Sequence, residues 1–251
     1  MPPNAPPPPI HALLVAGGKY HDIDFARSEL LGLLGEHDAI RTRVAEDYRD
    51  LDALAESDFL ITYTCDVPGT PAQQDALAEY VAKGGRWFAL HGTNSVLEML
   101  REFVRTPRGH DTLMQTLGSQ FLAHPPVGPF TVRASAPDHP LVVGIEPFEV
   151  EDELYLSELH PPLEPLLETS YSGVADGFEE NEFTDDAPRP VMYLKPTGAG
   201  EVLYLTLGHC RGHYDMRPLM DYYPRVERGA WESPVFYELL RRGIRWAARL
   251  D

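Results

Sequence analysis

The stretch GGRWFALHGTNS, residues 84–95, contains a pair of glycines, a short apolar run, and His91 directly before another glycine. An apolar run of this length is typical of a strand that is buried on both faces of a parallel sheet. His91 therefore stands at a sharp turn that follows a strand. Many α/β enzymes place a nucleophilic serine or cysteine at such a turn, so the histidine raises the question of which chemistry replaces it.

Segments of the same kind flank this stretch. HALLVAG ends in Gly17 and Gly18 and is followed by DFARSELLGLLGEH, whose apolar residues recur at helical spacing. DFLITYT is another continuous apolar strand, and PAQQDALAEYVAKGG is a helix with Pro71 at its start. Strands that alternate with helices predict a mainly parallel sheet with helices on both faces. A further helix is expected after Thr93, and the strands are expected near residues 11–16, 40–45, 58–63, 86–90 and 202–207.

The middle third of the chain has a different pattern. It contains short β-like runs separated by proline and glycine clusters, namely PFTVRAS, FEVEDELYLSEL, PLLETSY and RPVMYLK. These runs predict hairpins or an antiparallel, β-rich insertion. EVLYLTLG is again a continuous apolar run of the kind found in buried strands. SPVFYELLRRGIRWAARL is an amphipathic closing helix with Ser233 as its cap. Residues 211–231 fit no regular element, and we interpret them as a lid over the site or as a contact in a homodimer.

Length and composition indicate one domain and a small-molecule ligand. The chain has 251 residues, of which 43% are hydrophobic, enough for one core over residues 11–251. Residues 1–10 are proline-rich and are expected to be a disordered leader. The net charge of -18 argues against binding to nucleic acid or to an anionic membrane. The two cysteines lack CxxC spacing and fit reduced thiols, so a cytoplasmic location is expected.

Several short motifs occur in an order that resembles one known family. They are Gly17-Gly18 followed by His21, GGRWFALHG, FLAHP at 121–125, DHPLVVGI at 138–145, DELY at 152–155, and GAGEVLYLTLGH ending at His209. Together they resemble the ThuA-like (trehalose utilisation) family over about residues 11–250. The resemblance implies a flavodoxin-like α/β fold related to the class I glutamine amidotransferases. It also implies a role in sugar catabolism, with a carbohydrate such as trehalose, a related glucoside or a 3-keto-sugar as ligand.

Three histidines follow predicted strand ends, where the binding crevice of an open α/β sheet lies. They are His21, His91 and His209. Because His91 replaces the amidotransferase cysteine, we do not expect a glutamine amidotransferase. Imidazole can instead transfer protons near neutral pH. We therefore assign His91 and His209 as catalytic residues that act on a sugar together with an acid from EDELY, and we expect no cofactor.

Strand alternation decides which acid faces the site. In a regular strand Asp152 and Leu154 share one face, while Glu153 and Tyr155 share the other. Only one acid can then point into the site, and we take Glu153 as the catalytic carboxylate. The residues expected to bind the substrate are His21, His124, Tyr20, Tyr155 and Asn94.

Two alternatives stay open beside this metal-free hypothesis. In the first, a divalent ion such as zinc makes the protein a metal-dependent hydrolase or lyase, with His91, His124, His209 and Glu153 as ligands. None of these residues has the close spacing of an HExxH or CxxC motif, and we place the metal-free hypothesis ahead. In the second alternative, the chain is a sugar-binding module without catalysis, because a fold does not determine a function.

Overall fold

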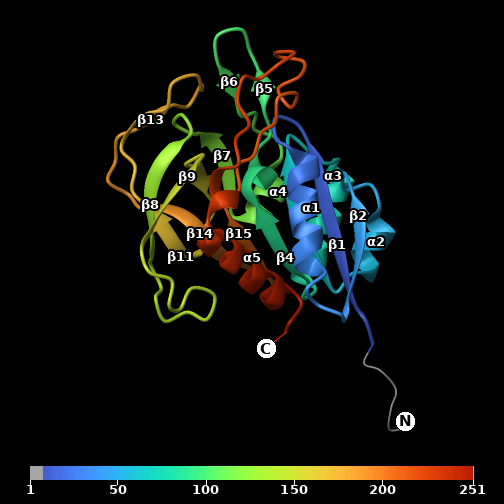
Figure 1. Cartoon of the computed structure of the whole chain (residues 1–251). Coiled ribbons are helices and arrows are strands. Elements are labelled where there is room, and N and C mark those ends of the chain that lie inside the picture. The colour runs from blue at the N-terminus through green and yellow to red at the C-terminus, as the bar shows by residue number, and fades with distance from the viewer. Residues whose placement is uncertain (1–7, 251) are drawn as a thin grey trace, which may run out of the picture.

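A mixed sheet of nine strands forms the centre of the computed structural model, which describes residues 8–250 (Figure 1). Its parallel part consists of β1 (Ile10–Gly18), β2 (Ile40–Ala45), β3 (Phe59–Cys65), β4 (Arg86–Leu90) and β15 (Gly200–Leu205). Its antiparallel part consists of β8 (Gly128–Ala134), β9 (Phe148–Asp152), β11 (Glu164–Thr169) and β14 (Arg189–Thr197). The order across the sheet is β2-β1-β3-β4-β15-β14-β11-β8-β9. The first five strands follow the order of flavodoxin-like sheets, which confirms the predicted fold class.

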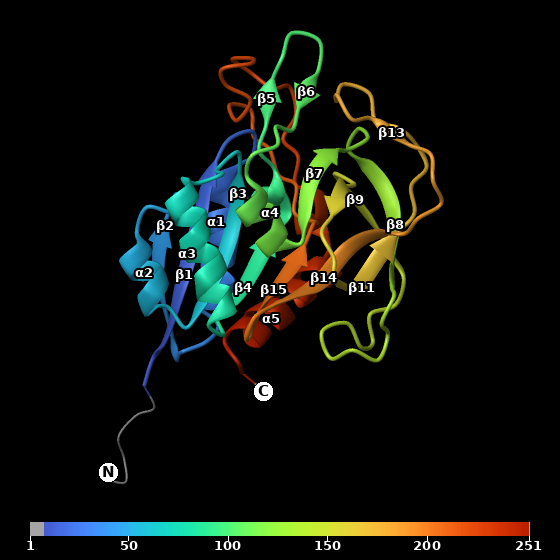
Figure 2. The ribbon, with the colours of Figure 1, turned by 180° about the vertical axis from the view of Figure 1, so that it is seen from behind.

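Helices cover both faces of the parallel part, as predicted (Figures 1 and 2). One face carries α1 (Ile23–Leu34) and α5 (Pro234–Ala247), and the other carries α2 (Leu51–Glu56), α3 (Pro71–Ala82) and α4 (Asp111–Leu117). The alternation of β4 shows how the two cores are separated: Phe88 packs with α1 and α5, whereas Trp87 packs with the other three helices. Both side chains are completely buried. The continuous apolar run of this strand therefore supplies both cores.

The β-rich insertion lies beyond β15, as the middle third of the sequence predicts. Besides the four antiparallel strands of the large sheet, it includes short pairs built from β7 (Ser119–Ala123) with β10 (Leu156–Leu159), and β12 (Gly173–Val174) with β13 (Glu182–Phe183). The β-like run FEVEDELYLSEL is not one continuous strand, so the regular alternation expected over residues 152–155 is wrong. The run divides after Asp152 into β9 and β10, which pair in different sheets. Residues 153–155 lie between these two strands and belong to neither.

The helix predicted after Thr93 is also absent from the described chain. A short 3-10 turn, η1 (His91–Asn94), is followed by the hairpin of β5 (Glu98–Met99) and β6 (Val104–Arg105). The backbone of Val104 bonds to a distant segment, because its N–H donates to Gly177 O and its carbonyl accepts from Glu179 N. These long-range bonds replace the helical ones, and α4 begins only at Asp111.

Residues 211–231 form a loop at the same end of the sheet as the β5–β6 hairpin (Figures 1 and 2). The loop is closed at its base by an antiparallel bridge between Arg211 and Glu227, and it leads into the 3-10 turn η2 (Gly229–Glu232). Most of the proline-rich segment, residues 1–7, lies outside the described residues. Over residues 8–250, no helix has the length and apolar character that a membrane crossing requires.

Substitution of Gly243 tests how tightly α5 packs on the sheet. A Cβ atom at Gly243 of α5 would lie 2.3 Å from Cε1 of the buried Phe88 ring. Alanine in place of a helical glycine normally stabilises by roughly 0.5–1 kcal/mol, but overpacking a core costs roughly 1–3 kcal/mol. We expect Gly243→Ala to lower the free energy of unfolding by about 1–2 kcal/mol in urea denaturation.

Gly32 of α1 provides the matched control, because a Cβ atom there would meet no other atom within 4 Å. Gly32→Ala is expected to raise the free energy of unfolding by about 0.5–1 kcal/mol. Stabilisation by both substitutions would show that α5 does not pack closely against Phe88.

Candidate functional site

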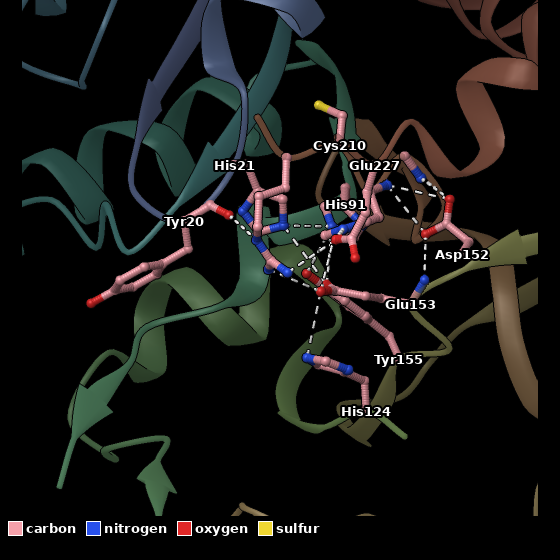
Figure 3. Close-up of polar contacts among 12 residues, drawn as sticks. Tyr20, His21, His91, His124, Asp152, Glu153, Tyr155, Cys210 and Glu227 are labelled. Atoms are coloured by element: carbon pink, nitrogen blue, oxygen red, sulfur yellow. Dashed lines mark hydrogen bonds and ion pairs between the residues drawn. The ribbon is translucent and has the colours of Figure 1, made fainter. Parts of the chain in front are cut away.

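Four histidines and one glutamate converge at the carboxyl ends of the parallel strands (Figure 3). His21, His91 and His209 follow β1, β4 and β15, respectively. The insertion supplies the other two residues, because His124 follows β7 and Glu153 follows β9. All except His124 are buried, with exposures between 0% and 6%. Strands that are far apart in the sequence thus deliver five titratable side chains to one place.

His91 occupies a strained turn. Its φ of 43° lies in the left-handed region, which is uncommon for a residue with a side chain. The next residue must be a glycine, because a Cβ atom at Gly92 would lie 2.7 Å from Thr64 O. The Tyr204 hydroxyl donates to His91 O over 2.5 Å and helps to fix the turn. This geometry corresponds to the sharp turn predicted from GGRWFALHG.

Each of the four histidines has one ring nitrogen bonded outward, away from the cluster. The outward contacts are His21 Nδ1 to Lys19 O (3.2 Å), His91 Nδ1 to Thr206 O (2.8 Å), His124 Nδ1 to Pro125 O (2.7 Å) and His209 Nε2 to Glu227 Oε2 (2.8 Å). Carbonyl and carboxylate oxygens only accept hydrogen bonds, so the outward nitrogen carries the proton in every case. In a neutral ring the inward nitrogen then presents a lone pair.

The inward nitrogens surround the carboxylate of Glu153. His21 Nε2 and His91 Nε2 lie 2.9 Å apart, and they are 3.7 Å and 3.4 Å from Glu153 Oε2. His209 Nδ1 is 3.1 Å from Glu153 Oε1, yet its geometry is not that of a hydrogen bond, and it has no other partner in the described chain. Two lone pairs that face each other at 2.9 Å repel unless a cation lies near them.

This donor set fits a divalent transition metal ion. One ligand atom from each of His21, His91, Glu153 and His209 lies within 4.8 Å of the others. Three imidazoles and one carboxylate are a typical set for zinc or a related ion. Histidine ligands characteristically donate their second N–H to a carbonyl or carboxylate, as all of these histidines do. The metal set predicted from the sequence needs a correction, because His21 takes the place of His124.

The protonation states within the cluster differ strongly. Burial lowers the pKa of His21 to about 3, so its ring is neutral. Burial alone would also lower the pKa of His209, but the carboxylates of Glu153 and Glu227 outweigh it and raise the pKa to about 9. For Glu153, burial would raise the pKa, yet the neighbouring histidines hold it well below its usual value. The carboxylate at the centre of the cluster is therefore ionised.

Arg211 and Glu227 belong to the site but were not predicted as site residues. Arg211 donates to Glu153 Oε1 over 3.3 Å and to Glu227 Oε2 over 3.2 Å. Burial would lower the pKa of Arg211, but these two carboxylates raise it. Arg211 lies two residues after His209, and a period of two along an extended chain was a usable signal. Glu227 lies in a segment without a pattern, and nothing in the sequence marked it.

The buried carboxylate of Asp152 fixes the backbone beside the cluster. Its carboxylate is 1% exposed and accepts hydrogen bonds from the backbone N–H groups of Gly208, His209 and Ala230, over 2.8–3.3 Å. It thereby joins the end of β15, which carries His209, to the start of η2. Of the two adjacent acids, Glu153 reaches the histidines, and Asp152 holds the backbone beside them.

A cavity of about 280 Å³ adjoins the cluster and contains most of the predicted substrate-binding side chains. Its lining includes Tyr20, His21, His124 and Tyr155. Asn94 is not brought there, because it is fully buried and donates to Ser119 Oγ over 2.7 Å. His91 and His209, with 0% exposure, do not line this cavity either. A substrate in the cavity therefore meets His21, His124 and Glu153 but is separated from the other two histidines.

Comparisons with known proteins agree with this architecture. A family model described as trehalose utilisation (ThuA) matches residues 11–223. The sequence has no match among the curated proteins. Similar solved structures include a protein described as ThuA-like from Bacteroides uniformis, with 19% identity, a TM-score of 0.68, and coverage of 98% of this chain and 95% of that one.

Two further solved structures have the same kind of fold. A protein described as ThuA-like from Parabacteroides merdae has 17% identity and a TM-score of 0.61, with coverage of 96% of this chain and 90% of that one. A beta-galactosidase from Rahnella sp. R3 has 13% identity and a TM-score of 0.55, with coverage of 97% of this chain and 32% of that one. At these identities the likeness shows the fold alone.

Proposed function

Because the chain belongs to the ThuA (trehalose utilisation) family, we propose that it is a sugar-processing enzyme whose histidine and glutamate cluster binds a divalent metal ion. The proposed substrate is a small carbohydrate of the glucoside or 3-keto-glucoside class. A net charge of -18 favours such a ligand over nucleic acid. We further propose that the reaction is hydrolysis or elimination at the sugar.

The inward nitrogens of His21 and His91 carry the proposal of a metal ion. His21 and His91 each use Nδ1 as a donor to a backbone carbonyl, so their Nε2 atoms face each other as acceptors at 2.9 Å. Because His91 and His209 are fully buried and do not line the cavity beside the cluster, they are poorly placed to exchange a proton with a substrate. Holding an ion together with Glu153, which does line the cavity, suits their buried position better.

A bound divalent ion would act as a Lewis acid on an oxygen atom of the substrate. The remaining site residues supply the proton chemistry. His124 is 23% exposed, and its Nδ1 donates to Pro125 O, so Nε2, which lies 3.6 Å from Glu153 Oε1, is the nitrogen that would exchange a proton with the substrate. Burial raises the pKa of Tyr155 well above its usual value, so the hydroxyl keeps its proton and can donate a hydrogen bond. Arg211 holds Glu153 in place and balances its charge.

A metal-free acid and base pair is the second candidate. Within one cluster, the pKa of His21 is lowered to about 3 by burial, and that of His209 is raised to about 9 by its two carboxylates, against the effect of burial. Titratable groups whose pKa values are pushed apart commonly serve as the acid and the base of one reaction. In this candidate His209 would be the acid, and Glu153 would hold it in its charged form.

The metal content of the purified full-length protein separates the two candidates. We expect about one divalent transition metal ion per chain by mass spectrometry, as for a site with four protein ligands. Removal of the ion with dipicolinate should abolish turnover and lower the melting temperature by several degrees, since an ion bound only to the folded state stabilises it. Added zinc or another divalent ion should restore both.

If the protein carries no ion, and dipicolinate changes neither turnover nor melting temperature, the cluster does not act as a metal site. The metal-free candidate then replaces the proposal.

A further inference from the structure

The cavity beside the cluster has a predominantly apolar wall, which bears on the substrate class of the proposed enzyme. The apolar side chains come from distant segments: Leu97, Met99 and Val104 from the β5–β6 hairpin region, Phe121 from β7, Phe178, and Met216 and Leu219 from the 211–231 loop. The histidine, carboxylate and guanidinium groups in its lining are those of His21, His124, Glu153 and Arg211, and all of them lie at the cluster. Away from the cluster, the lining of this cavity therefore contains no charged side chain that could pair with a ligand.

Aromatic contacts join this wall directly to the cluster. The Phe178 ring meets the His124 ring edge to face at a centroid distance of 5.0 Å, and it meets Phe121 at 5.7 Å. Phe121 in turn lies 4.6 Å from the ring of Tyr155. The apolar wall therefore starts directly beside His124 and Tyr155, which are proposed to act on the substrate.

A second cavity, of about 510 Å³, meets the cluster at the same residues and has a different character. His124, Glu153 and Arg211 line both cavities. The rest of the second lining is rich in polar and charged groups, including Glu151, Tyr223, Arg225, Arg228 and Glu232. Such groups suit the hydroxyls of a sugar ring. The cluster thus lies between a polar compartment and an apolar one.

We propose that the substrates are glycosides, or keto-glycosides, that carry an apolar aromatic aglycone, with the sugar in the polar cavity and the aglycone against Phe178. The proposal rests on the proposed sugar-processing function and narrows its substrate class. A second, fully hydroxylated sugar ring, as in trehalose, would lose its hydrogen bonds with water against Leu97, Met99 and Phe178. An aromatic ring gains free energy from the same burial and packs well against other rings.

A buried hydroxyl lies beside Tyr155 in the lining of the apolar cavity. Ser95 is 2% exposed and lines this cavity beside Tyr155, and its Oγ has no hydrogen bond of standard geometry in the described chain. Buried hydroxyls are rarely left without a partner. A glycosidic oxygen at the junction of sugar and aglycone would be a suitable acceptor for this hydroxyl.

Calorimetric titration of the full-length protein with simple glucosides tests the proposal, and for a ligand that is turned over kcat/KM is compared in place of the affinity. The probes are 4-nitrophenyl glucosides of both anomers, the corresponding methyl glucosides, and trehalose. We expect one 4-nitrophenyl glucoside to bind at least about tenfold more tightly than its methyl counterpart and than trehalose, as burial of an aromatic ring predicts. Phe178→Ala should remove most of this preference and leave the affinity for the methyl glucoside unchanged.

Two further variants keep the test decisive. Phe183→Ala removes another half-buried ring of the insertion that does not line the cavity, and it should leave the preference intact. Leu219→Asp alters a side chain that is 46% exposed and places a charge in the wall, and it should weaken only the aryl ligand. Equal affinities for aryl and methyl glucosides, or tighter binding of trehalose, would overturn the proposal. An aryl preference in a protein that carries no ion and turns over no sugar would uphold the proposed pocket while the proposed function fails.

Discussion

Replacement of His91 by alanine is expected to remove the bound ion and to lower turnover about a thousandfold, within the range found when a group essential for catalysis is removed. The imidazole Nε2 lies 2.9 Å from His21 and 3.4 Å from Glu153, so its loss opens the cluster at its centre. The measurement is kcat, on whichever glucoside or 3-keto-glucoside the wild type turns over, together with the metal content of each variant.

Two variants accompany His91→Ala. His91→Asn retains a residue that tolerates the φ of 43° at this turn, and it should lose turnover equally, which separates the loss of imidazole from backbone strain. His11→Ala removes an exposed histidine near the start of β1, at the opposite end of that strand from the cluster, and it should change turnover by less than about twofold, as surface substitutions usually do. Full turnover in His91→Ala would rule out both the metal-dependent and the acid–base hypothesis for this residue.

The parallel half of the sheet could be predicted because its strands are buried on both faces. Such strands require continuous apolar runs. RWFAL and DFLITYT are runs of this kind, and a helical segment separates them, as in a parallel sheet. The family resemblance extended this prediction to the flavodoxin-like order, and the observed strand order confirms it. The helix predicted after Thr93 was wrong for a physical reason. Residues 98–105 have apolar spacing compatible with a helix, but Val104 pairs with a segment more than 70 residues away.

The histidines could be located because topology alone brings strand ends together. Parallel strands of one sheet must deliver His21, His91 and His209 to the same edge. The depth at which each histidine lies depends on the loops. The sequence therefore could not predict that His21, and not His124, belongs to the metal set. The partner of His209 was also hidden, because Glu227 reaches the site through a loop whose path is set by its bridge to Arg211.

Asp152 is expected to be the most important single residue for the stability of this end of the molecule. Its buried carboxylate accepts backbone N–H groups from Gly208, His209 and Ala230. In Asp152→Ala these donors would be buried without an acceptor, and each such donor costs roughly 1–3 kcal/mol. We therefore expect the free energy of unfolding to fall by about 3–5 kcal/mol, which places this substitution among the exceptional ones.

Urea denaturation of three variants tests this expectation. Asp152→Asn keeps one acceptor oxygen but turns an NH₂ group toward the backbone donors, so its loss should lie between that of alanine and the wild type. Asp186→Ala removes an exposed carboxylate of the insertion and should change the free energy of unfolding by less than about 0.5 kcal/mol. A fall of less than about 1 kcal/mol in Asp152→Ala would mean that water replaces the carboxylate without cost. In that case the position of His209 depends on its contacts with Glu153 and Glu227 and not on the backbone beneath it.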